Sequence, residues 1–180
     1  DKWTSSVRGL PAVFYDRSFK NKTNKGKTSN TRFLLNLGCT PLNSPDFRKV
    51  SLDKYLTYQT LINEDLGKLK IPHTQKYSKS NLIRFMSNYP EAIIKPRFGS
   101  GGKGIIKVAK KGSSYLINYL DKSTTATDSN LVDRIDEVRK SMRSNGRTYI
   151  IQECITLPKY NGGVFDVRVI YQRDKAKKPV

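Results

Sequence analysis

The chain has 180 residues, of which 34 are Lys or Arg and 15 are Asp or Glu, so its formal net charge at pH 7 is +19. Hydrophobic residues make up 36% of the sequence and aromatic residues 10%, which excludes wholesale disorder and fits one domain, or one domain and a fragment of another. No apolar run reaches the roughly 18 residues of a membrane-spanning helix, and the first residues lack the apolar segment of a signal peptide. We therefore expect a cytoplasmic protein with no membrane span.

The surplus of positive charge favours phosphate-bearing partners, which include nucleic acid, nucleotides and anionic lipid. The basic residues are dispersed, and the sequence contains no zinc-finger, RRM or basic-zipper signature. The charge therefore predicts a surface that suits polyanions, but it does not choose a partner. The two cysteines, Cys39 and Cys154, lack Cys-x-x-Cys spacing, so neither a disulfide scaffold nor a structural zinc site is indicated.

Apolar segments in the first half of the chain predict short elements separated by loops. The pattern over residues 10–16 is typical of a short strand, and residues 33–38 form a short apolar element. Helices are expected over residues 51–63 and 80–89, each with the serine at its first position as the N-cap.

The second half of the chain predicts a mainly antiparallel sheet with one helix. Residues 92–98 and 105–111 are β-like and flank a glycine loop, which is typical of a hairpin. An amphipathic helix is expected between Asp128 and Asn145, because apolar residues recur there every three or four positions. Residues 114–120 predict a further strand or the edge between a strand and a helix, and strands are expected over residues 147–155 and 164–174. This order of elements indicates an α+β fold.

The glycine loop, Gly99 to Gly104, matches the pattern Gly-x-Gly-x-x-Gly. A dinucleotide-binding fold would need a helix to begin inside this motif, but the β-branched Ile105 and Ile106 follow it. A Walker A loop would need Ser or Thr after Gly-Lys, where this sequence has Gly104. Two interpretations remain: a hairpin tip whose backbone N–H groups approach phosphate oxygens, and a flexible tip without a ligand.

Lys95 lies four residues before the glycine loop, inside the apolar segment Ala-Ile-Ile-Lys-Pro. An ammonium among isoleucines is costly unless it meets an anion, and a nucleotide phosphate is a natural candidate. The alternative is a strand-edge lysine that extends to water.

Five segments occur in the order of an ATP-grasp protein. They are Lys54 in LDKY, Pro72 and Thr74 in IPHT, Lys95 to Ile105 in KPRFGSGGKGI, Gln152 and Glu153 in YIIQECI, and Asp166 to Arg168 in FDVRVIYQRD. Together with LPAVFYDR near the start, they make residues 10–174 resemble the YheC/YheD-like branch, the endospore coat-associated ATP-grasp proteins of spore-forming bacteria. The resemblance implies an α+β ATP-grasp fold, in which an antiparallel sheet carries the glycine-rich hairpin and helices pack on it.

The resemblance also implies that ATP is clamped and that a carboxylate is activated as an acyl-phosphate, which an amine or thiol then attacks. Lys54 and Lys95 resemble the lysines that hold the phosphates, and the Ser100 and Gly101 amides would donate to phosphate from the hairpin. Arg168 resembles the catalytic arginine that meets the transferred phosphate or the acceptor carboxylate, and Asp166 would orient it. The implied nucleotide-binding set is Lys54, Lys95, Gly99, Ser100, Gly101, Gly102, Lys103, Gly104, Gln152, Glu153, Cys154 and Ile155.

Residues 152–155 resemble the hinge between the two lobes, where the backbone of Cys154 and Ile155 would pair with the adenine edge. Considered without the resemblance, Glu153 is a strand-end charge in water and Cys154 is a small buried residue. For Lys103 two interpretations stay open: contact with phosphate, and contact with solvent alone. His73 is not expected to be catalytic.

Magnesium is the expected second cofactor, but the Glu-x-Asn motif of ATP-grasp enzymes is absent from this sequence. The acids after Glu153 are Asp166 and Asp174, so no metal ligand is assigned and the ligands are expected beyond residue 180. The expected organisation is an N-terminal segment over residues 1–75 and an incomplete ATP-grasp nucleotide-binding region, truncated at its C-terminus, over residues 76–180.

Two functions from different classes follow. The first is an ATP-dependent carboxylate-amine or carboxylate-thiol ligase, with ATP and an unknown carboxylate-containing acceptor as partners. The second is a non-catalytic module, associated with the spore coat or with a polyanion, on a degenerate ATP-grasp scaffold. A small-molecule or polyphosphate kinase would share the same scaffold.

Overall fold

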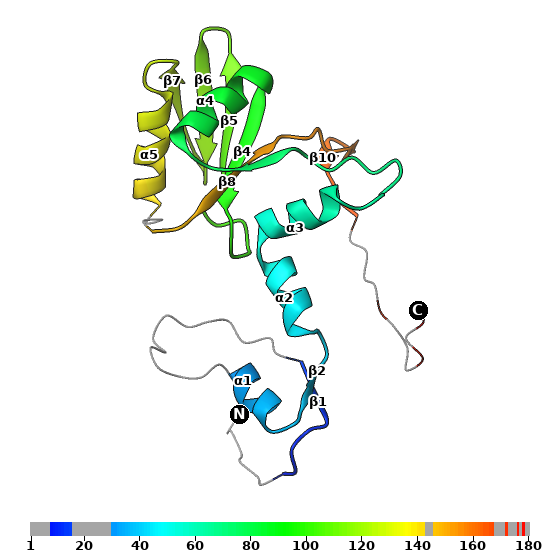
Figure 1. Ribbon diagram of the computed structural model, residues 1–180. Coiled ribbons are helices and arrows are strands. Elements are labelled where there is room, and N and C mark those ends of the chain that lie inside the picture. The colour runs from blue at the N-terminus through cyan, green and yellow to red at the C-terminus, as the bar shows by residue number, and fades with distance from the viewer. Residues whose placement is uncertain are drawn as a thin grey trace. The chain divides into compact units, whose positions relative to one another are not determined.

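The computed structural model describes residues 8–15, 30–142, 146–167, 172, 176 and 178. The chain divides into two compact units (Figure 1). The first unit contains the residues up to Ile71 together with Pro96–Lys103, and the second contains Pro72–Lys95 together with the residues from Gly104 onward. The glycine loop up to Lys103 thus belongs to the first unit. The strands on either side of it, apart from Pro96, belong to the second unit.

The first unit is built from short helices and one small strand pair. Its described elements are β1 (Val13–Phe14), α1 (Asn30–Asn36), β2 (Thr40–Pro41), α2 (Pro45–Leu52) and α3 (Lys54–Ile62). β1 pairs with β2 in parallel. The strand expected over residues 10–16 is therefore confined to two residues, and the apolar segment 33–38 begins inside α1.

The single helix predicted over residues 51–63 is wrong, because two helices meet at Asp53. The backbone of Asp53 is extended, with φ −108° and ψ 102°, so the chain leaves the helical conformation there. Ser51 is not an N-cap but lies within α2, and the N-cap of α2 is Ser44. The Ser44 hydroxyl accepts a hydrogen bond from the N–H of Phe47 at 3.1 Å, and the proline that follows Ser44 suits the first position of a helix.

Within the described residues, the second unit contains a six-stranded sheet whose strand order is β3-β8-β4-β5-β6-β7. Its strands are β3 (Thr74–Lys76), β4 (Glu91–Pro96), β5 (Ile106–Lys111), β6 (Ser114–Tyr119), β7 (Lys122–Thr127) and β8 (Tyr149–Glu153). The pairs β3 with β8, β4 with β5, β5 with β6, and β6 with β7 are antiparallel. The predicted hairpin around the glycine loop is thereby confirmed, whereas β7 was not predicted.

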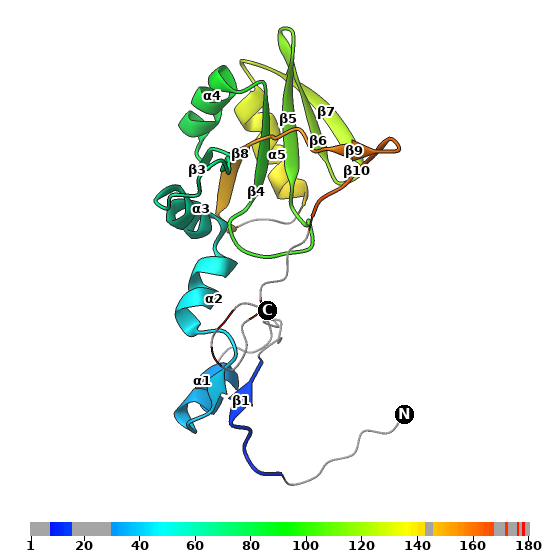
Figure 2. The ribbon, with the colours of Figure 1, turned by 90° about the vertical axis from the view of Figure 1, so that its right-hand side faces the viewer.

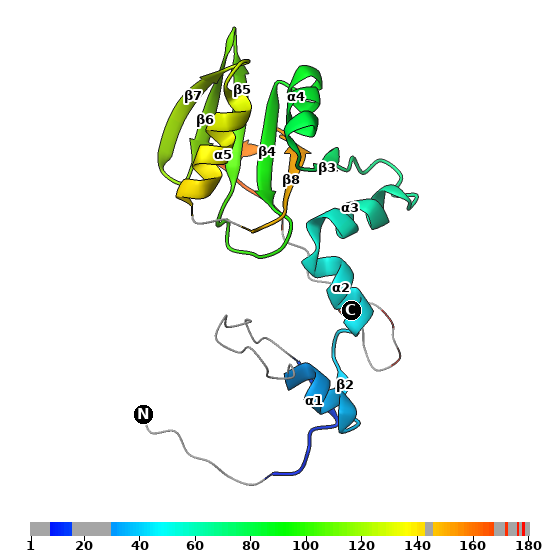
Figure 3. The same ribbon diagram turned by 60° about the vertical axis from the view of Figure 1, so that its left-hand side comes forward.

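Helices α4 (Lys79–Asn88) and α5 (Leu131–Ser141) pack on one face of this sheet, as Figures 2 and 3 show. Ala92 and Ile94 of β4 are fully buried on that face. Because side chains alternate along a strand, Lys95 lies on the opposite face. The core that the helices cover contains Leu82, Phe85, Met86, Ile106, Val108, Ile117, Ala126, Leu131, Ile135, Val138, Tyr149 and Ile151, together with the two β4 residues.

Both predicted helices of this unit are found, but the predicted N-cap of α4 is wrong. The helix expected between Asp128 and Asn145 is confirmed, and α5 buries Leu131, Ile135 and Val138. Ser80 is not the cap of α4, because the helix begins two residues earlier, where the Ser78 hydroxyl accepts from the N–H of Asn81 at 3.1 Å.

The long strand predicted over residues 164–174 is wrong where it can be compared. Only Val164 is in a strand: β10 (Gly163–Val164) pairs antiparallel with β9 (Lys159–Tyr160), and residues 165–167 are not in a strand. Val164 and Val167 are 62% and 79% exposed, so their apolar side chains are not packed in the described part of the protein. Most of the remaining segment lies outside the described residues. None of the helices in the described ranges is both long and apolar enough to cross a membrane.

Candidate functional site

The glycine loop leaves β4 after Pro96 and enters β5 at Ile106. Gly99, Gly101, Gly102 and Gly104 have φ values of 102°, 72°, 69° and 82°, in the region that favours glycine. A Cβ added at Gly99, Gly101 or Gly102 would meet nothing within 4 Å. These three positions therefore need glycine for the conformation of the backbone rather than for space.

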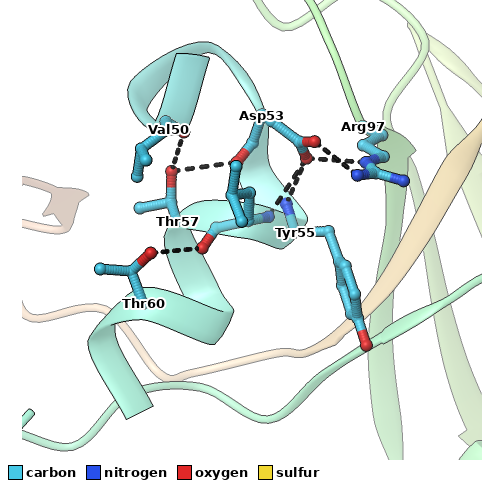
Figure 4. Close-up of polar contacts among 7 residues, drawn as sticks. Val50, Asp53, Tyr55, Thr57, Thr60 and Arg97 are labelled. Carbon is cyan, nitrogen blue, oxygen red and sulfur yellow. Dashed lines mark hydrogen bonds and ion pairs between the residues drawn. The ribbon is translucent and has the colours of Figure 1, made fainter. Parts of the chain in front are cut away.

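Asp53, in the first unit, carries a buried carboxylate that receives four hydrogen bonds. Its Oδ1 accepts from the N–H groups of Tyr55 and Leu56 at 3.0 and 3.2 Å, and so caps α3. The guanidinium of Arg97 donates to the same carboxylate, from Nε to Oδ1 at 2.7 Å and from Nη2 to Oδ2 at 2.5 Å (Figure 4). The hydrogen bonds from Arg97 hold the pKa of Asp53 below its ordinary value, against the effect of burial. The carboxylate is therefore ionised at neutral pH.

Lys54 follows Asp53 and contacts the start of the glycine loop. Its Nζ donates to the carbonyl of Gly99 at 2.7 Å, and its backbone N–H donates to the carbonyl of Arg97 at 3.1 Å. Burial lowers the pKa of Lys54, and the charge of Asp53 acts in the opposite direction. Two residues predicted to bind the nucleotide, Lys54 and Gly99, are thus in direct contact, while Ser100 and Lys103 are exposed.

In the second unit a chain of hydrogen bonds runs across three strands. Lys95 Nζ donates to Gln152 Oε1 at 2.6 Å, and Gln152 Nε2 donates to Thr74 Oγ1 at 2.8 Å. The hydroxyl of Thr74, which is 2% exposed, donates to the carbonyl of Pro72 at 3.0 Å. Because that hydroxyl uses its proton on Pro72, it can only accept from Gln152, and the amide oxygen is directed to Lys95. β4 lies between β8 and β5, so the interpretation of Lys95 as a strand-edge lysine is wrong.

Glu153 is bound to the segment before β3. Its N–H donates to the carbonyl of His73 at 2.9 Å, and its Oε2 accepts from the N–H of His73 at 3.2 Å. The ring of His73 is stacked with those of Phe85 and Tyr89, at centroid distances of 5.7 and 5.8 Å. Glu153 is therefore not simply a strand-end charge in water.

Cys154 follows β8 and lies beside an ion pair. Its N–H donates to the carbonyl of Glu91 at 3.4 Å, and Glu91 pairs with Lys107 at 2.9 Å. Burial raises the pKa of the Cys154 thiol, although the charge of Lys107 lowers it. The thiol is therefore protonated at neutral pH, which suits a packing residue better than a nucleophile. Ile155, the next predicted hinge residue, is 48% exposed.

Arg168 lies outside the described residues, and Asp166 is exposed. Within the described ranges, no three or more His, Cys, Asp or Glu side chains come together in a group that could hold a metal ion.

Asp53 and Arg97 join α3 to the start of the glycine loop, and neither was predicted from the sequence. One signal was present for Asp53, since an Asp directly before a run of helix-forming residues is a common N-cap. Arg97 carried no local signal, because its partner is 44 residues away.

The structure thus has a glycine-rich loop between two antiparallel strands, with Lys95 on the strand before the loop and Lys54 at the loop's first carbonyl. Residues 43–179 match the family model described as YheC/D like ATP-grasp, and the chain belongs to this family. The predicted family and the predicted α+β ATP-grasp fold are thereby confirmed.

Similar proteins include one curated relative and two solved structures. The relative is the endospore coat-associated protein YheC of Bacillus subtilis (strain 168), which is 24% identical over 180 residues. The match covers 97% of this chain and 47% of the relative, so the chain spans about half the length of that protein. The D-cycloserine synthetase DcsG matches 70% of this chain and 39% of its own, with 13% identity and a TM-score of 0.41. The ATP-grasp ligase PsnB, solved with a minimal precursor, matches 81% and 44%, with 16% identity and a TM-score of 0.43.

Proposed function

We propose that the chain binds ATP and belongs to a ligase that activates a carboxylate as an acyl-phosphate before joining it to an amine or thiol. Family membership supports ATP as the partner. The observation that carries the proposal is the ammonium of Lys95, which sits on a central strand, on the face away from the helices, and is held in place by Gln152. A cation fixed in this way suits a phosphate, because its geometry is set before the ligand arrives.

The proposed reaction has two steps. A carboxylate oxygen of the acceptor attacks the γ-phosphorus of ATP, and ADP leaves with the electrons of the broken bond. The nitrogen of an amine, or the sulfur of a thiol, then attacks the acyl carbon, inorganic phosphate leaves with the electrons of the broken C–O bond, and the nucleophile's proton passes to water. In this scheme Lys54, Lys95 and the amides of the glycine loop neutralise phosphate charge, and Arg168 meets the transferred phosphate or the acceptor carboxylate.

The remaining predicted nucleotide contacts belong to the same proposal. The backbone after Glu153, at Cys154 and Ile155, would pair with the adenine edge. Magnesium, when bound, would supply further neutralisation of phosphate charge. The described residues offer no group of acidic side chains for it, so no step is assigned to the ion.

The proposal predicts that replacement of Lys95 weakens ATP binding specifically. Lys95→Ala removes one phosphate partner and should cost roughly 1.5–3 kcal/mol, about a tenfold to hundredfold loss of affinity, as measured by calorimetric titration. Lys122→Ala on β7 is the matched control, since it removes the same charge from an exposed position. Equal ATP affinities for wild type and both variants would contradict the assignment of Lys95.

The reaction class is tested on a longer preparation that extends beyond residue 180, where the resemblance implies the magnesium ligands. Hydroxylamine, added with ATP and a panel of amino-acid and peptide carboxylates, converts an acyl-phosphate into a hydroxamate. The proposal requires hydroxamate that depends on both ATP and a carboxylate and that is lost in Lys95→Ala.

A second candidate function is non-catalytic binding of a polyanion, which the net charge of +19 favours. Binding of this kind falls steeply with salt, because it releases many counterions. A polyphosphate affinity that falls steeply with salt, equally in wild type, Lys95→Ala and Lys122→Ala, would favour this candidate. Association with the spore coat is proposed from the description of the relative alone.

A further inference from the structure

The contacts around Asp53 lead to an inference about how the glycine loop, residues 99–104, is held. We propose that Asp53 is a positioning residue for this loop: through Arg97 it fixes the point from which the loop starts and so aims the loop amides at the ATP phosphates. The inference rests on the proposed function, because it concerns the same ligand.

The ion pair between Asp53 and Arg97 is bidentate. Two parallel hydrogen bonds join the guanidinium of Arg97 to the two oxygens of Asp53, which fixes the orientation of the guanidinium as well as its position (Figure 4). The guanidinium carbon also lies 5.6 Å from the ring centroid of Tyr55 and 5.3 Å from that of Phe98. Asp53 itself is 5% exposed and is held by α3, so the pair is anchored to a helix.

The backbone on either side of the ion pair is also held in place. Three consecutive residues contact Asp53 or Lys54: the Arg97 carbonyl accepts from the Lys54 N–H, Phe98 forms a β-bridge with Asp53, and the Gly99 carbonyl accepts from Lys54 Nζ. The chain is therefore fixed up to the first glycine of the loop. Residues 100–103 beyond this point are exposed, so their course depends on the three fixed residues.

The positioning role of Asp53 is distinct from its role as the N-cap of α3, and variants can separate the two. Asp53 also accepts from two backbone N–H groups of α3, so its loss could act on the helix instead. Asp53→Ser keeps an N-cap hydroxyl and loses the partner of Arg97, whereas Arg97→Gln keeps the cap and loses the guanidinium. Both variants break the ion pair and leave α3 capped. Asp46→Ser, at an exposed position in the first turn of α2, is the control for the change in charge.

The experiment measures two quantities separately, the order parameters of the loop amides and the affinity for ATP. The order parameters of the Gly101 and Gly102 amides are expected to fall from about 0.8 toward 0.6 in Asp53→Ser and in Arg97→Gln, but not in Asp46→Ser. ATP affinity is expected to fall about tenfold in the first two variants, because binding must then order the loop. The double variant should be no weaker than either single variant, since both remove the same contact.

The outcomes distinguish the inference from the proposed function. Unchanged order parameters in both variants would overturn the positioning role of Asp53, whatever happens to ATP. Lower order parameters with unchanged ATP affinity would also overturn it, because the loop would then not be aimed at the phosphates. If wild type does not bind ATP, the proposed function and the aiming of the loop at phosphate fail together, while the order parameters still show whether Asp53 holds the loop.

Discussion

The carboxylate of Asp53 accepts from two N–H groups of its own helix and from two nitrogens of Arg97, yet the side chain is only 7% exposed. An ionised group at this depth is stable only when its hydrogen bonds replace those of water. The ionised form of Asp53 therefore depends on its hydrogen bonds from Arg97.

At the scale of residues, Arg97→Gln is expected to lower the free energy of unfolding by about 2 kcal/mol at pH 7. This is less than the roughly 3–5 kcal/mol for breaking a fully buried pair, because the Arg97 side chain is 26% exposed. The pKa of Asp53 is lowered in the folded protein, so the stabilisation is complete above its ordinary value of 3.8 and is lost as the pH falls through the folded value. The difference between variant and wild type should therefore shrink below about pH 4.

The measurement is urea unfolding at pH 7 and at pH 3, followed by the NMR signals of α3. Arg134→Gln on α5, whose partner Glu137 is exposed, serves as the control and should change stability by less than about 1 kcal/mol. A difference for Arg97→Gln that is equal at both pH values would contradict the role given to the Asp53 charge.

Single residues were predictable from the sequence where the reason was local. Lys95 was singled out because a lysine inside an apolar strand is costly, and the structure gives it the amide of Gln152 as a partner, while its role at a phosphate stays a prediction. The caps at Ser51 and Ser80 were wrong because several serines and aspartates compete near each helix start. The residue that caps α3, Asp53, also binds Arg97, a contact between residues 44 positions apart in sequence.

At the scale of elements, Gly102→Val tests the glycine hairpin. Gly102 has a φ of 69°, which a β-branched residue adopts only under strain, and the added side chain would stand where the backbone is proposed to approach phosphate. We expect the variant to lose most of its ATP affinity in a calorimetric titration and to keep its fold, as judged by circular dichroism.

The control for this variant is Gly112→Val at the turn between β5 and β6. Gly112 also has a positive φ, of 59°, and a Cβ there would also meet nothing within 4 Å. The control should share the strain and keep the affinity. Normal ATP binding by Gly102→Val would mean that Gly102 is a turn residue and that the loop does not hold phosphate.

Elements were predictable where their own residues alternate or repeat. The hairpin of β4 and β5 and the helix α5 follow from apolar periodicity, and both were found. β7 was missed because its sequence, KSTTAT, contains a single buried residue, Ala126, and is paired to the sheet by its neighbour β6. The apolar alternation around Val164 predicted a strand, but alternation alone supplies no partner to pair with.

At the scale of the whole molecule, burial is distributed unequally between the two units. In the described part of the first unit, only Cys39, Asp53 and Pro96 are buried, and neither α2 nor α3 has a buried residue. The second unit contains the hydrophobic core between the sheet and its two helices. Regions with few buried apolar contacts open at a lower cost in free energy than the core.

Native-state hydrogen exchange should therefore separate the two units. The amides of α2 and α3 are expected to exchange at least about 100-fold faster than those of β5 and β6. Heat unfolding followed by the same signals should show the first unit opening before the second. A single transition, with equal protection throughout, would contradict this picture.

The α+β class and the sheet of the second unit follow from sequence patterns, since they depend on the alternation of side chains within each strand. The assignment of residues 96–103 to the first unit does not, because it results from contacts between Arg97 or Gly99 and residues near position 53. Contacts between residues so far apart in the sequence produce no periodic pattern of side chains.

The hydrogen bond between Gln152 and Thr74 has a further consequence for how the sheet assembles. These residues are direct partners in the pairing of β8 with β3, a three-residue strand at the sheet edge. A short edge strand is prone to slip, and a slip of one residue would place Ile151 opposite Thr74 and leave its buried hydroxyl without the amide. The polar pair thus penalises misalignment, so the contact that orients Lys95 also specifies the register in which β3 joins the sheet.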